Sequence, residues 1–195
     1  MVVTLPLLLR MTCKKMILEG YQLNHGLCQA LSIAFSHFKD IASDFHLDSN
    51  SLTDDDFAVL LEGMGDLREV ERLTYINNAF GQKSLEALVP MLASDPKTGL
   101  RSLHLKHCKM AAKVTTRLLY SFNHQRNYIK SLSLVNVNLC QQNCQALCEF
   151  IRGARVLHKL DISWNGMGCH QMYELLTVIA ENRTLHDLNL SYNNF

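Results

Sequence analysis

This sequence contains little proline and glycine, the residues that most often interrupt helices and strands. Its positive and negative charges nearly balance. Only three Pro and nine Gly occur among 195 residues, and without a low-complexity run we expect no flexible linker. The formal net charge of +1 argues against a nucleic-acid partner, because such a surface concentrates basic side chains. No stretch approaches about 18 consecutive apolar residues, so we predict no transmembrane helix and no membrane insertion.

Local signatures of catalysis are missing as well. The chain contains no glycine-rich phosphate-binding loop, no HExxH motif and no GxSxG motif, which are the patterns of nucleotide, zinc-protease and serine-hydrolase sites. We therefore predict a protein that is not an enzyme and that carries no cofactor and no metal. The hydrophobic content of 48% predicts one domain with a substantial core.

What the sequence does contain is a pattern that returns every 28–30 residues. The pattern is LxxLxLxxNxL, with other apolar residues allowed at the Leu positions. Its seven copies start at Cys13, Ala42, Val70, Leu100, Ile129, Leu157 and Leu185. A fixed period of this length is typical of a solenoid. We predict parallel strands near residues 15–19, 44–48, 72–76, 102–106, 131–135, 159–163 and 187–191.

A second pattern supports the same register. The position eighteen residues after each start is Leu in all six complete repeats: Leu31, Leu60, Leu88, Leu118, Leu147 and Leu175. Apolar residues also recur three residues before and four residues after that Leu in most repeats, which is the spacing of one helix face. Each repeat is therefore predicted to be a strand, a tight loop and a helix of roughly three turns.

These motifs resemble leucine-rich-repeat proteins of the ribonuclease-inhibitor-like class. The resemblance covers residues 13–195 and implies an α/β leucine-rich-repeat solenoid, or horseshoe, with a parallel sheet on the concave face and helices on the convex face. Six complete repeats and a truncated seventh follow residues 1–12, which we interpret as the tail of a preceding repeat or an N-terminal cap. The chain departs from the family at Tyr21 and Val137, which occupy the Asn position. In the family, the side chain of that Asn forms hydrogen bonds with the loop backbone of adjacent repeats, and successive repeats build a ladder of such bonds. We therefore expect this Asn ladder to be weaker at Tyr21 and Val137.

Both ends of the sequence suggest a larger chain or assembly. Met1 to Leu9 are apolar but lack a basic leader, so we expect no secretory signal. Phe195 is the last apolar position of the repeat pattern, and no polar terminal cap follows it. We expect this sequence to be a fragment, an isoform or a portion of a longer protein.

Seven cysteines, an odd number without paired spacing, indicate free thiols. Because Cys28, Cys144 and Cys148 fall on helix core positions, we expect a reducing compartment and a cytoplasmic location. The resemblance adds cytoskeletal and ciliary settings as possibilities. A metal site built from Cys140 and its neighbours would need about four converging ligands, so core packing is the favoured interpretation of these thiols.

The acidic run Asp54–Asp56 precedes a helix core position at Phe57. Carboxylates at a helix start cap free N–H groups and complement the helix dipole. Calcium binding would need more oxygen ligands at alternating spacing. We therefore predict that this run caps a helix.

The concave wall is the surface that the core does not use, because residues between the core Leu positions point the other way. The single Trp lies just after one strand, and a Tyr has the equivalent place one repeat later, so their rings should lie side by side. The candidate partner-binding residues are Trp164, Tyr192, His104, Lys106, His107, Asp161 and Asn189. The two aromatic residues are either a binding hot spot, a cover for the strand–loop edge, or a contact for an eighth repeat.

Nine His residues also invite a search for a catalytic base. No Ser or Cys nucleophile is identified with a partner Asp in the same row of the wall, and we interpret His46, His104 and His107 as solvated surface residues.

We predict a non-catalytic scaffold that binds another protein on its concave face. The resemblance leaves two alternatives: a GTPase-activating protein of the Ran type, which needs a loop Arg or Asn aimed at the nucleotide, and the ligand-sensing repeat region of a NOD-like receptor.

Overall fold

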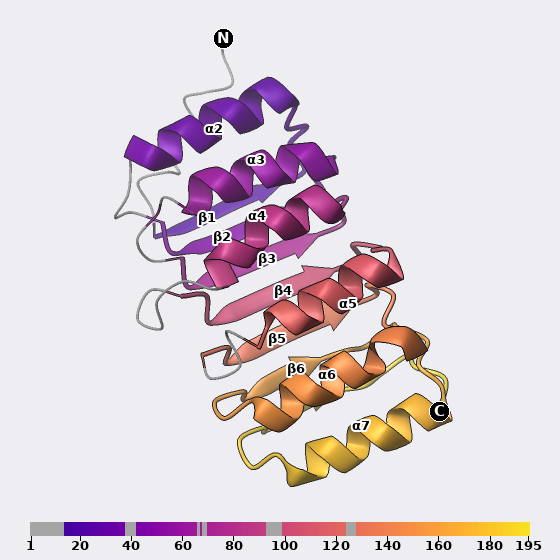
Figure 1. The fold of residues 1–195 in the computed structure, drawn as a ribbon. Coiled ribbons are helices and arrows are strands. Elements are labelled where there is room, and N and C mark those ends of the chain that lie inside the picture. The colour runs from indigo at the N-terminus through magenta and orange to yellow at the C-terminus, as the bar shows by residue number, and fades with distance from the viewer. Residues whose placement is uncertain (1–13, 38–41, 66, 68–69, 93–98, 124–127) are drawn as a thin grey trace.

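The chain forms two layers, one of parallel strands and one of helices that cover a single face of the sheet (Figure 1). The computed structural model describes residues 14–37, 42–65, 67, 70–92, 99–123 and 128–195. The strands, in spatial and chain order, are β1 (Lys15–Glu19), β2 (Asp44–Asp48), β3 (Arg72–Ile76), β4 (Ser102–Lys106), β5 (Ser131–Val135), β6 (Lys159–Asp161) and β7 (Asp187–Asn189). The helices are α2 (His25–His37), α3 (Asp54–Gly65), α4 (Gln82–Leu92), α5 (Ala112–Ser121), α6 (Gln141–Gly153) and α7 (Cys169–Glu181).

This arrangement confirms the predicted α/β solenoid. Every neighbouring pair of strands is parallel, and register partners such as Leu103 and Leu132 are 29 residues apart. The predicted bounds of the first five strands are confirmed. Residues 1–12 and Cys13 lie outside the described residues.

The last two strands are shorter than predicted, because they end at Asp161 and Asn189 rather than at residues 163 and 191. The reason lies in their own final side chains. Asp161 Oδ1 accepts a hydrogen bond from the backbone N–H of Ser163 at 3.2 Å, and Asn189 Oδ1 accepts one from Ser191 at 3.1 Å. Such Asx turns compete with the strand ladder for the N–H group two residues on.

The predicted helix stripe forms the core between the two layers. All six Leu residues of the stripe are at most 5% exposed, and Phe57, Leu85 and Thr115 in the flanking turns are fully buried. Aromatic rings fill the N-terminal part, where Phe57 stacks on Tyr75 with ring centroids 3.6 Å apart. One member of the stripe, Ile179 of the last helix, is only half-buried.

Asn side chains tie most repeats to the repeat before them. Asn165 Oδ1 accepts the backbone N–H groups of Val137 and Leu139 at 3.0 and 3.2 Å, and its amide donates to the Leu134 carbonyl at 2.7 Å. Asn193 repeats this arrangement on Asn165 and Met167. These bonds satisfy loop N–H groups that would otherwise be buried without an acceptor.

The ladder is interrupted where Val137 occupies the Asn position, as the sequence predicts. Val137 is fully buried and has no side-chain acceptor for the N–H groups of Cys108 and Met110. The amide of Asn138 compensates in part by donating to the Met110 carbonyl at 3.0 Å. The repeats that contain β4 and β5 are therefore held together with fewer loop hydrogen bonds. The bonds expected to be lost at Tyr21 involve residues outside the described ones.

Restoring the missing ladder residue should stabilise the protein. We expect Val137→Asn to raise the free energy of unfolding by about 1 kcal/mol, because the new amide can bond loop groups as Asn165 does. Equilibrium unfolding in urea measures the change. The reverse substitution one repeat later, Asn165→Val, is the matched control and should destabilise by about 1–3 kcal/mol, since it leaves buried N–H groups without acceptors. A clear loss of stability in Val137→Asn would contradict the ladder interpretation.

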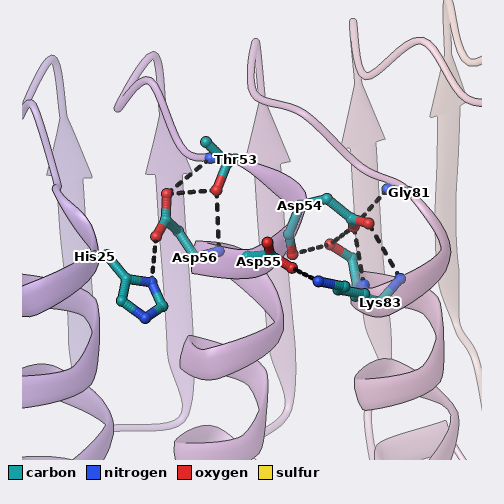
Figure 2. A network of polar contacts seen from close by, with 8 residues as sticks. His25, Thr53, Asp54, Asp55, Asp56, Gly81 and Lys83 are labelled. Atoms are coloured by element: carbon teal, nitrogen blue, oxygen red, sulfur yellow. Dashed lines mark hydrogen bonds and ion pairs between the residues drawn. The ribbon is translucent and has the colours of Figure 1, made fainter.

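The acidic run caps helices, as predicted, but the three carboxylates serve different partners (Figure 2). Asp56 forms a capping box on its own helix α3: its carboxylate accepts from Thr53 N–H at 3.2 Å, and Thr53 Oγ1 accepts from Asp56 N–H at 3.2 Å. Asp54 instead accepts the N–H groups of Gly81, Lys83 and Ser84 at 2.7–3.1 Å, at the start of the neighbouring helix α4. Asp55 pairs with the ammonium group of Lys83.

The described cysteines carry no disulfide. Cys28, Cys144 and Cys148 are buried, which confirms their predicted core positions, and Cys108 is buried as well, whereas Cys140 is half-buried at the start of α6 and Cys169 is exposed. Within the described residues, no three His, Cys, Asp or Glu side chains converge on a possible metal position. Among the helices in those ranges, none has the length and apolar character that crossing a membrane requires.

Candidate functional site

A row of left-handed residues follows the seven strands. After each of the five longer strands, the next residue has a positive φ. The equivalent residue of the last two repeats does too, and all seven φ values lie between 52° and 68°. These residues, here called the left-handed row, are Gly20, Ser49, Asn77, His107, Asn136, Trp164 and Tyr192. In six repeats the N–H group of this residue donates to a carbonyl of the next repeat, as from Trp164 to Ser191 at 3.1 Å. The positive φ thus keeps the sheet ladder continuous while the chain turns.

The C-terminal end of the left-handed row carries a stacked aromatic pair. The rings of Trp164 and Tyr192 have centroids 4.1 Å apart and an interplanar angle of 19°, so the predicted side-by-side placement is confirmed. Both rings remain exposed, by 52% and 68% respectively. The stack is therefore an apolar surface that the fold leaves in contact with water.

Bulky side chains are unusual in this conformation. Gly, Asn and Asp adopt the left-handed region most readily, and other L-residues lose about 1–2 kcal/mol there. Five of the seven positions hold Gly, Ser, Asn or His. Trp164 and Tyr192 thus occupy strained backbone positions without being buried in return, which is a pattern found at sites that contact a partner.

A polar cluster lies beside the stack on the open face of the sheet, the face without helices. His104 Nδ1 lies 2.7 Å from the Oγ of Ser133. Asp161, the register partner of Ser133, accepts a hydrogen bond from the Ser163 hydroxyl at 2.7 Å and lies 4.0 Å from the ammonium group of Lys106. Burial lowers the pKa of His104 to about 4, and the nearby positive charges of Lys106 and Arg72 act in the same direction. His104 is therefore neutral at physiological pH.

This cluster corrects two sequence-based interpretations. His104, Ser133 and Asp161 do share one row of the sheet register, contrary to the prediction that no Ser has a partner Asp in its row. The hydroxyl rather than the imidazole lies in the middle, so the order differs from a catalytic triad, in which the imidazole bridges the other two groups. The neutral His104 is also not a fully solvated residue, because much of its ring is buried.

Some positions of the predicted binding wall are closed by their neighbours. Ser133, Val135 and Ser163 are at most 5% exposed. Ser133 lies under His104, Val135 lies beside Lys106 in the register, and Ser163 is bonded to Asp161. The wall therefore presents fewer exposed residues than its pattern predicts.

The structure places all seven candidate residues on or just after strands β4 to β7. Lys106 and Asp161 approach each other, and Asn189 is the register partner of Asp161. His107 belongs to the left-handed row, where the amide of Asn136 donates to its Nδ1 at 3.2 Å. Ser133 was not among the candidate residues predicted from the sequence, although its spacing of 29 residues from His104 is the repeat period and could have identified it.

Comparisons with known proteins agree with the repeat architecture. No protein-family model matches the chain. Over 123 residues the chain is 25% identical to the human NACHT, LRR and PYD domains-containing protein 13. The matched region covers 63% of this chain but only 12% of that protein. Among solved structures it is similar to the tropomodulin C-terminal domain of Caenorhabditis elegans, with a TM-score of 0.55 and 14% identity over 81% of this chain and 92% of that one. Together with the period and the parallel register, these likenesses fit a solenoid of the leucine-rich-repeat type.

Proposed function

We propose that the open face of the sheet and the left-handed row bind a partner protein, and that the chain is a non-catalytic interaction scaffold. The observation that carries this proposal is the stacked, exposed pair of Trp164 and Tyr192 at left-handed positions. Trp and Tyr are the residue types that contribute most often to binding hot spots. The adjacent cluster of His104, Lys106 and Asp161 supplies polar groups for the rim of such an interface.

The class and location of the protein belong to the same proposal. The period of 28–30 residues and helices of 10–13 residues support the ribonuclease-inhibitor-like class. Buried free thiols such as Cys28 and Cys108 support a reducing, intracellular location. The likeness to the tropomodulin C-terminal domain supports a cytoskeletal setting.

A second candidate function is supported by the sequence relative. The name of that protein combines leucine-rich repeats with NACHT and PYD domains, and the matched region spans about an eighth of its length. In that case the repeats would form the sensing region of a larger, NOD-like receptor. The same surface would then recognise a ligand, and the nucleotide-binding region would lie outside this sequence.

Substitution of the aromatic pair by Asn tests the proposed interface. Asn already occupies the left-handed row at residues 77 and 136, so Trp164→Asn with Tyr192→Asn should preserve the fold or stabilise it by about 1 kcal/mol. Partners are collected by affinity purification of the tagged chain from cells and identified by mass spectrometry. We expect the double variant to lose specific partners, with Kd for a purified partner raised about 30-fold or more, as for central anchors worth about 2 kcal/mol.

Tyr173→Ala is the matched control, because this Tyr is 75% exposed on α7, away from the left-handed row. The control should recover the same partners as the unmodified chain. Equal recovery by the double variant would reject the proposed interface. Lost recovery together with a lowered melting temperature would instead indicate that the stack has a structural role.

A further inference from the structure

A large groove lies on the helical layer, between α3 and α4, and is separate from the open face of the sheet. Its volume is about 1410 Å³. Its apolar lining includes Ala58, Leu61 and Met64 of α3 and Ala87 and Met91 of α4. Ala87 is partly exposed, whereas the other four are at most 9% exposed and lie at the floor of the groove.

A polar network lines one end of the groove. Near the starts of the two helices, Asp56 is bonded to Thr53 and lies 2.9 Å from His25 Nδ1, and Asp55 is paired with Lys83 (Figure 2). These groups already have partners within the protein. His25, Asp55 and Lys83 nevertheless remain more than half exposed, so this end of the groove is in contact with water.

Farther along the groove lie two carboxylates that have no cationic partner among the described residues. Glu62 and Glu86 are exposed, and neither forms an ion pair with any residue in the described part of the chain. The lining as a whole contains four carboxylates and one ammonium group, a net charge of −3 with His25 neutral. The whole chain has a net charge of +1, so the negative charge is concentrated locally here.

We propose that this groove binds a basic amphipathic helix of a partner protein. The helix would place its apolar face on the floor around Ala58 and Ala87 and its Lys or Arg side chains next to Glu62 and Glu86. This is the helix-in-groove mode of recognition, in which anchors recur three or four residues apart. The 12 residues of α3 and 11 of α4 give the groove walls a length of about 16–18 Å, which matches three turns of a bound helix.

A pair of model peptides tests both parts of the proposal. The probes are fluorescein-labelled amphipathic helices of about 14 residues, one built from Leu and Lys and the other from Leu and Glu, which span about 21 Å. Fluorescence anisotropy with the whole chain should show binding of the Leu/Lys peptide that weakens as salt screens the carboxylates. The Leu/Glu peptide should bind at least about tenfold more weakly because of like-charge repulsion.

Matched charge variants distinguish the groove from general electrostatic attraction. Glu62→Gln with Glu86→Gln should raise the Kd of the Leu/Lys peptide about fivefold, as expected for two exposed ion pairs. Glu149→Gln with Glu174→Gln removes the same charge from α6 and α7 and should leave Kd unchanged. Equal effects of the two double variants, or equal binding of the two peptides, would overturn the proposal.

Hydrogen exchange with mass spectrometry then locates the peptide. Bound Leu/Lys peptide should slow amide exchange in residues 54–65 and 82–92, which form α3 and α4. Protection of the strands alone would overturn the proposal. Because the groove and the Trp164–Tyr192 stack are on different faces, the Trp164→Asn and Tyr192→Asn variant should retain peptide binding, so the two proposals can fail independently.

Discussion

Replacing Leu147 by Ala is expected to lower the free energy of unfolding by about 2–5 kcal/mol, and Leu118→Ala should have an effect in the same range. Both side chains are fully buried between sheet and helix. Truncation removes apolar area and leaves a cavity, because the close-packed layers cannot relax enough to fill it. The rings of Phe122 and Phe150, with centroids 5.3 Å apart, lie in the same part of the core.

Equilibrium unfolding in urea, followed by circular dichroism, gives the change in free energy. Leu176→Ala is the matched control, since this Leu follows the stripe position of α7 but is 43% exposed. It should cost less than about 1 kcal/mol. A loss of the same small size for Leu147→Ala would show that the stripe does not carry the core.

The second large effect is expected at Asp54, whose carboxylate caps the helix that follows its own. Asp54→Ala should destabilise the protein by about 2 kcal/mol, because it removes the acceptor for three backbone N–H groups at the start of α4 and for the Ser84 hydroxyl at 2.5 Å. Asp55→Ala is the control, because it breaks only an exposed ion pair with Lys83 and should cost less than about 1 kcal/mol. Equal losses in the two variants would contradict the inter-repeat cap.

The contribution of Asp54 should also depend on pH. Burial by itself raises the pKa of this carboxyl, but hydrogen bonds from Ser84, Lys83 and Gly81 outweigh it and hold the pKa below its ordinary value of 3.8. A depressed folded-state pKa means that the stabilisation is fully present above pH 3.8 and is lost as the pH falls through the folded-state pKa. The difference in stability between the unmodified chain and Asp54→Ala should therefore be constant at neutral pH and shrink in strong acid. A difference that grows on acidification would contradict this account.

The repeat pattern predicted most of the strands and helices because each repeat carries apolar residues at the same spacing. Core Leu positions fixed the register of β1 to β5, and the same register placed Trp164 beside Tyr192. The pattern could not predict the ends of β6 and β7, which depend on whether Asp161 and Asn189 bond to their own backbone. It also could not predict left-handed Trp and Tyr, since these residue types seldom adopt that conformation.

Features formed between repeats were the hardest to predict from sequence. The run at Asp54 was correctly interpreted as a helix cap, but the capped helix α4 lies one repeat away, so its identity depends on how the helices stack. The contact between His104 and Ser133 depends on side-chain length across two strands. The groove between α3 and α4 likewise is lined by residues of both helices, such as Ala58 and Ala87, that come together only in the folded protein.

The Asn ladder has a direction, and this direction bears on how the protein forms during synthesis. Asn165 and Asn193 bond backbone groups of residues that are translated 26–28 positions earlier. A newly made repeat therefore keeps unsatisfied loop N–H groups until the next repeat has left the ribosome and its Asn can reach back. The Asp54 cap runs the other way, since Asp54 emerges before the α4 N–H groups that it accepts. The repeat that contains Cys108 gains no such hydrogen bonds when the next repeat is synthesised. The Asn position of that next repeat is occupied by Val137, whose side chain has no acceptor.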